Sequence, residues 1–293
     1  MTTPRKQQPV TGFQRSFVVG VDRAVYWFSR HWLAVFNVLV LIYVGLPILA
    51  PVLMNAGADG PARVIYTMYK PMCHQMAQRS FFLFGEQYAY PREIAGTDLV
   101  PIEAYTDNIA DFQGVSDGDW PAFFTAARRF VGNEQLGYKM ALCERDIGIY
   151  GFVLIGGLVF GLLRYRVKIR PLPLILFIII GLGPIALDGF SQLFSYWAVP
   201  IDGSEPAGIM ATLSGLLPLR ESTPLLRALT GALFGFMLAW LAYPQVEKGM
   251  AGTREDLRVK LSRLEEPASG QPASGKQVAS RTTVAPSENP EAD

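Results

Sequence analysis

The stretch HWLAVFNVLVLIYVGLPILAPVLM, residues 31–54, decides the fold. It contains no formally charged side chain if His31 is neutral. At a rise of 1.5 Å per residue, a helix of this length crosses a hydrocarbon core of about 30 Å. The stretch therefore predicts a membrane-spanning helix.

Three further segments carry the same apolar signal: residues 146–163, 172–194 and 224–243. The third is interrupted by Gly183 and Pro184 close to Asp188, so we expect a broken helix there. The whole chain is 50% hydrophobic and only 17% charged, whereas about 25% charged is usual in soluble proteins. The predicted fold class is an all-α integral membrane protein with four transmembrane helices.

Lysine and arginine gather in an N-terminal arm (1–30), in the connection 164–171 and after residue 243. These three clusters are each separated by two predicted spans, as the positive-inside rule requires if they share one side. The pattern predicts a multi-pass protein of the cell membrane with both termini in the cytoplasm. Residues 55–145 and 195–223 then form extracytoplasmic loops.

Within the first loop, residues 119–130 resemble a short amphipathic helix with Asp119 as its N-cap. The run SFFLFG, residues 80–85, predicts an interfacial or re-entrant end, because it is too short to span and too apolar for water. The segment 244–293, whose last part is rich in Pro, Ala, Ser and Glu, is expected to be a disordered cytoplasmic tail.

Both cysteines, Cys73 and Cys143, fall in the first loop. A structural disulfide between them suits an extracytoplasmic compartment. A metal site formed by Cys73, His74, Cys143 and Asp146 has ligand types suited to zinc or a similar divalent ion. Free thiols beside an ordinary histidine are the third interpretation, and the residues alone leave all three open.

Ionisable residues of several predicted helices meet at the same outer level of the membrane. Asp188 is the least expected of them, because a carboxylate inside an apolar span is costly without a partner. We assign candidate catalytic roles to Asp188, Arg145 and Glu221. Candidate substrate-binding residues at the same level are Arg220, Arg227 and Gln192.

Several functional classes lack their signatures. A formal net charge of +1 disfavours a nucleic-acid binder, and no nucleotide-binding loop, H-E-x-x-H or G-x-S-x-G motif occurs. Two hypotheses stay open: an enzyme or lipid-handling protein that acts on an anionic headgroup, and a non-catalytic accessory subunit of a larger membrane complex or homo-oligomer. The G-x-x-x-G spacings at 157–161 and 231–235 favour close helix packing within one chain over dimerisation.

Four sequence pieces in the same order resemble one family: CHQMAQRSFFLFG (73–85), CERDIGIYG (143–151), ALDGFSQL (186–193) and RESTPLLRALTG (220–231). It is an uncharacterised family of prokaryotic integral membrane proteins, domain of unknown function 2085. The family pattern reads C-x-R-C before G-I-Y, whereas this chain has Asp146 in place of the second cysteine. The resemblance implies a site at these positions and implies no activity.

Overall fold

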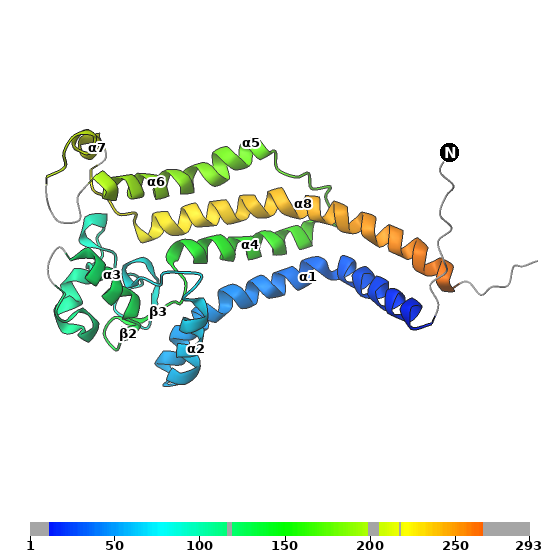
Figure 1. The fold of residues 1–293 in the computed structure, drawn as a ribbon, viewed down its shortest axis with the longest axis horizontal. Helices are drawn as coiled ribbons and strands as arrows, with labels where there is room; N and C mark the ends of the chain where they lie inside the picture. Colours follow the sequence, from blue (N-terminus) through cyan, green and yellow to red (C-terminus); the bar gives the residue numbers. More distant parts are fainter. Residues whose placement is uncertain (1–11, 116–118, 199–204, 217, 266–293) are drawn as a thin grey trace, which may run out of the picture.

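The computed structural model describes residues 12–115, 119–198, 205–216 and 218–265. Four helical segments within these ranges are long and apolar enough to cross a membrane, and they lie side by side in Figure 1. They are α1 (Phe13–Asn55), α4 (Glu144–Leu163), the third span 174–198, and α8 (Pro224–Glu265). The predicted all-α membrane fold with four spans is confirmed.

Two helices are longer than their apolar runs. The first span begins at Phe13, and α8 continues to Glu265, so the expectation of disorder was wrong for 244–265. Polar contacts tie the two extensions together: Lys260 Nζ lies 2.6 Å from Asp22 Oδ2, and Trp32 Nε1 donates to Glu247 Oε2 at 2.8 Å. Both extensions run past the end of α4 in Figure 1. The rest of the expected tail, 266–293, lies outside the described residues.

The third span is distorted but not broken. It starts as α5 (Leu174–Leu176), widens into a π-helical stretch η5 (Phe177–Leu182) and continues as α6 (Gly183–Ala198). Pro184 has no backbone N–H to donate to the preceding turn, which accounts for a widened stretch just before it. The irregularity therefore precedes the predicted position, and Asp188 lies in regular helix.

Glycines set the contact between α4 and α8. A Cβ on Gly235 would lie 2.1 Å from the carbonyl oxygen of Ile149, and one on Gly231 would lie 2.4 Å from that of Arg145. In return, a Cβ on Gly148 would lie 2.4 Å from the carbonyl oxygen of Ala228. Only glycine permits this backbone approach, so the predicted packing within one chain is confirmed for 231–235.

Residues 56–115 and 119–143 form a small domain at one end of the bundle, here called the loop domain (Figure 1). It contains α2 (Asp59–Tyr69) and α3 (Trp120–Arg129). The described part of the second loop contains α7 (Ile209–Leu216), which contacts α6. Four short 3₁₀ helices accompany them in the described loop domain: η1 (Ala77–Arg79), η2 (Glu93–Ala95), η3 (Ile102–Asn108) and η4 (Ala110–Phe112). The predicted helix at 119–130 is confirmed, because the Asp119 carboxylate accepts the N–H of Ala122 at 3.0 Å.

Three short antiparallel strands, which the sequence did not predict, hold the loop domain together in the order β1-β3-β2. They are β1 (Phe82–Leu83), β2 (Gly132–Asn133) and β3 (Gly137–Lys139), and Phe82 pairs with Lys139. Phe82 is buried in an aromatic core with Tyr90 and Phe130. The expectation of a membrane-interfacial end was therefore wrong for Phe82, because this apolar run supplies the core of a folded domain.

Candidate functional sites at the loop-domain end

Asp188 is the centre of the first cluster. One carboxylate oxygen lies 2.5 Å from Arg145 Nη2 and accepts the hydroxyl of Ser222 at 2.8 Å, while the other lies 3.0 Å from Arg220 Nη2. The Asp188 side chain is only 3% exposed. The partner that a carboxylate in an apolar span requires is thus present, with Arg145 contributed by α4.

Glu221 is the centre of the second cluster. Its carboxylate lies 2.9 Å from Arg79 Nε and 2.8 Å from Arg227 Nη2, and it accepts the Tyr196 hydroxyl at 2.9 Å. Burial by itself raises the pKa of Glu221, but the two guanidinium groups outweigh it, so the pKa lies below that of an ordinary glutamate. Arg227 also reaches Glu144 at 3.3 Å. Glu221 therefore joins α6, α8 and the loop domain.

These contacts argue against general acid–base catalysis by the two acids. Every oxygen of Asp188 and Glu221 already accepts from a guanidinium or a hydroxyl group. The pKa of Glu221 lies below that of an ordinary glutamate, whereas a general base needs a pKa near the working pH. The remaining predicted residue, Gln192, accepts the backbone N–H of Ser222 at 3.4 Å. The arrangement is suited to holding arginines in fixed positions.

The ion-pair layer carries surplus positive charge. Arg79, Arg145, Arg220 and Arg227 share three carboxylates, those of Asp188, Glu221 and Glu144. Arg79 was not predicted as part of the site, although it lies within the same motif as Cys73. Its position depends on η1 folding back towards α6 and α8, a long-range contact that local sequence patterns do not reveal.

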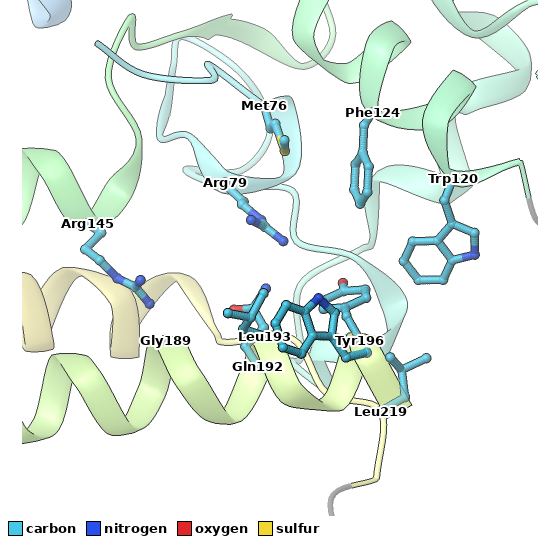
Figure 2. Close-up of a pocket in the computed structure, with 11 residues that line it drawn as sticks. Met76, Arg79, Trp120, Phe124, Arg145, Gly189, Gln192, Leu193, Tyr196 and Leu219 are labelled. Atoms are coloured by element: carbon cyan, nitrogen blue, oxygen red, sulfur yellow. The ribbon is translucent and has the colours of Figure 1, made fainter. Parts of the chain in front are cut away.

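A cavity of about 490 Å³ opens beside this layer, between α6, the start of α4 and the loop domain. Figure 2 shows Arg79 and Arg145 on one side and the rings of Trp120 and Phe124 on the other. Tyr196 packs edge-on against Trp120, with ring centroids 5.3 Å apart. The remaining lining is mostly apolar: Met76, Gly189, Gln192, Leu193, Trp197 and Leu219. The cavity thus joins a cationic end to an aromatic wall.

The two cysteines meet in a separate cluster. One ligand atom each of Cys73, Cys143 and Asp146 lies within 4.8 Å of the others, and the Cys143 thiol donates to Asp146 Oδ2 at 3.2 Å. The cysteine side chains are 4.0 Å apart and both are free thiols. The neighbouring Cys143 side chain lowers the pKa of Cys73 against the opposing effect of burial, while the interaction with Cys73 and burial raise the pKa of Cys143.

The sequence explains how these three residues come together. Cys73 follows the C-terminus of α2, where its N–H donates to the carbonyl oxygen of Tyr69 at 3.0 Å. Cys143 is the N-cap residue of α4, and Asp146 lies in the first turn. His74 is exposed and is not brought into the cluster. The next residue, Gln75, takes the buried position, with its side-chain amide donating to the carbonyl oxygens of Tyr66 and Ala141.

A buried lysine lies near the cluster. The Lys139 ammonium donates to the backbone carbonyls of Gln75, Ala127 and Arg128 at 2.5, 3.2 and 2.9 Å. Burial lowers the pKa of Lys139 to about 7, and the charge of Cys73 acts in the opposite direction. Among the described residues Lys139 has no carboxylate partner within ion-pair distance. The negative charges that favour the Lys139 ammonium are those of Cys73 and Asp111.

Fold and sites together define an integral membrane protein of four helices with a charged layer and a thiol cluster at one end. Residues 134–241 match the family model described as "Predicted membrane protein (DUF2085)", which confirms the resemblance for the pieces at 143–151, 186–193 and 220–231, while the piece at 73–85 lies outside the matched region. An uncharacterized protein of Methanocaldococcus jannaschii is 25% identical over 180 residues, covering 61% of this chain and 67% of that protein. No solved structure matches the chain.

Proposed function

We propose that the protein binds an anionic lipid in the cavity between α6 and the loop domain, with Arg79 and Arg145 holding the headgroup. The observation that carries this proposal is the pairing of two partly exposed arginines with an aromatic wall in one cavity. An amphiphile with an acidic head and an apolar body has the same two-part chemistry. In this proposal the protein binds the lipid and does not transform it chemically.

The arginines keep hydrogen-bonding capacity for a ligand. A guanidinium has five N–H donors, and Arg145 gives one of them to Asp188 at 2.5 Å. Its buried Nε has no partner among the described residues. Charge-assisted bonds from arginine to phosphate are among the strong ones in proteins, and the surplus positive charge of the layer favours an anion. The cavity also falls within the usual volume range of small-molecule sites, about 300–1,000 Å³.

The membrane position supports a lipid over a soluble anion. The cavity lies beside α6, which exposes large apolar side chains along its length, such as Leu187 and Phe190. A lipid tail can lie against this face while its head enters the cavity. By the positive-inside rule, the basic clusters predict that the loop domain lies on the extracytoplasmic side of the cell membrane, so the proposed ligand would be a lipid of the outer leaflet.

Lipid binding can be tested by quenching tryptophan fluorescence, because Trp120 and Trp197 line the cavity. The purified protein is reconstituted with brominated phosphatidylglycerol or brominated phosphatidylcholine. We expect stronger quenching by the anionic lipid, and at least a tenfold weaker preference in Arg79→Gln and Arg145→Gln, since one lost charge-assisted bond costs about 1.5–3 kcal/mol.

The matched control is Arg129→Gln, which removes an exposed arginine of α3 that does not line the cavity. This variant changes the net charge by the same amount as the two test variants, and the brominated lipids should quench its tryptophan fluorescence as they quench that of the native protein. Free phosphate or glycerol phosphate added in excess tests the source of the anion. Equal quenching of the native protein by both lipids, or an equal loss of the preference for the anionic lipid in all three variants, would contradict a specific headgroup site.

A further inference from the structure

We infer that Cys73, Cys143 and Asp146 form a metal site for a borderline-soft divalent ion of the zinc type. This site is independent of the lipid cavity, because it shares no lining residue with it. Two thiolates and one carboxylate are ligands that zinc accepts in proteins. Three protein ligands leave a fourth tetrahedral position for water or for a bound group.

The separations of the ligand atoms favour a metal. With Zn–S of about 2.3 Å and Zn–O of about 2.0–2.2 Å, tetrahedral angles place two sulfurs about 3.8 Å apart and a sulfur and an oxygen about 3.5 Å apart. The cysteine pair is at 4.0 Å and Cys143 Sγ lies 3.2 Å from Asp146 Oδ2, while the three ligand atoms all lie within 4.8 Å of one another, so a bound ion would draw them slightly closer together. A disulfide needs sulfurs about 2.05 Å apart, which is far from the separation seen.

The surroundings stabilise anionic ligands. The backbone N–H of Gln75 donates to Cys73 Sγ at 3.5 Å, the kind of outer contact that supports a metal-bound thiolate. Cys143 and Asp146 lie at the N-terminus of α4, where the helix dipole favours negative charge. Two thiolates, a carboxylate and a divalent cation carry a net charge of −1, which the buried ammonium of Lys139 can balance.

The exposure of the ligands and the rigidity of the loop that carries Cys73 also suit a metal site. Cys73 is buried, while Cys143 and Asp146 are partly exposed, so an ion can enter from one side. The loop that carries Cys73 is fixed by the buried Gln75 amide, whose two hydrogen bonds reach α2 and the segment before α4. Both cysteines are therefore held by structure that exists without the ion. The site is formed by the fold and does not require the metal to assemble it.

The test is metal analysis of the full chain combined with thiol labelling. We expect one zinc ion per chain after purification without chelator, or after zinc is added back to the reduced and chelated protein. Maleimide should label Cys73 and Cys143 only after chelation. Cobalt substitution should give a thiolate-to-metal charge-transfer absorption, which a merely structural role of these residues would not produce.

Variants separate the ligands from their neighbours. Cys73→Ser, Cys143→Ser and Asp146→Asn should lose the bound zinc, whereas His74→Ala, the matched control next to Cys73, should keep it. Asp146→Cys guards against loss through misfolding, because a third soft ligand should hold zinc more tightly against a chelator. If maleimide labels the two cysteines after reduction but not after chelation, they form a disulfide and the inference is overturned. Free labelling with no metal uptake would overturn it as well.

Discussion

Replacing Arg227 by methionine tests whether the buried ion pairs hold the helices together. Arg227 lies on α8 with its side chain only 4% exposed, and it pairs with Glu144 at 3.3 Å and with Glu221 at 2.8 Å. Glu221 keeps Arg79 after the substitution, but Glu144 loses the cation it pairs with. Breaking a buried pair by removing one partner costs about 3–5 kcal/mol.

Equilibrium unfolding in mixed micelles with a denaturing detergent, followed by circular dichroism, measures this loss. The double variant Arg227→Met with Glu144→Gln should recover most of the stability, because no unpaired charge is then left at Glu144. The control Arg254→Met breaks a pair whose side chains are 30% and 24% exposed, and should cost less than about 1 kcal/mol. If Arg227→Met costs less than about 1 kcal/mol, or if the double variant is no more stable than Arg227→Met alone, the buried ion pairs do not hold the helices together.

Three further perturbations test other contacts. Gly235→Ala places a methyl group against the α4 backbone and should cost about 3 kcal/mol or more in the same unfolding assay, whereas Gly249→Ala, with open space around it, should be neutral or stabilising by up to about 1 kcal/mol. Because the pKa of Glu221 is lower in the folded protein than in the unfolded chain, its contribution to stability is complete above about pH 4.3 and is lost as the pH falls through the folded-state pKa. The free energy of unfolding should therefore fall less steeply with decreasing pH in Glu221→Gln than in the native protein. Asp188→Asn should lower stability yet strengthen anion binding, because Arg145 is released; weaker anion binding in the quenching assay would show that Asp188 itself supports the ligand.

The spans could be predicted because a helix in hydrocarbon needs an unbroken apolar run, which is a local property of the sequence. The same reasoning placed Asp188 with a basic partner, since an isolated carboxylate in a span is costly. It underestimated α1 and α8, because their extensions are amphipathic and depend on contacts with each other, such as Lys260 with Asp22.

The loop domain could not be predicted to the same degree. Its strands are two or three residues long, too short for a periodic pattern to reveal. Trp120 and Tyr196 meet across the cavity only because this domain folds against α6. Adjacency in the chain also suggested His74 as a ligand beside Cys73, whereas the turn after α2 leaves that imidazole exposed.

The ion-pair layer also has a consequence for how the protein is made. Its members are synthesised in chain order, from Arg79 through Arg145 and Asp188 to Arg227, and most of its pairs join segments far apart in sequence. Glu144 acquires the counter-charge of Arg227 only when the last helix is synthesised and inserted. Until then the nascent chain carries uncompensated charges at the ends of its apolar spans. Completion of the layer therefore marks the step at which an insertion intermediate becomes a stable protein.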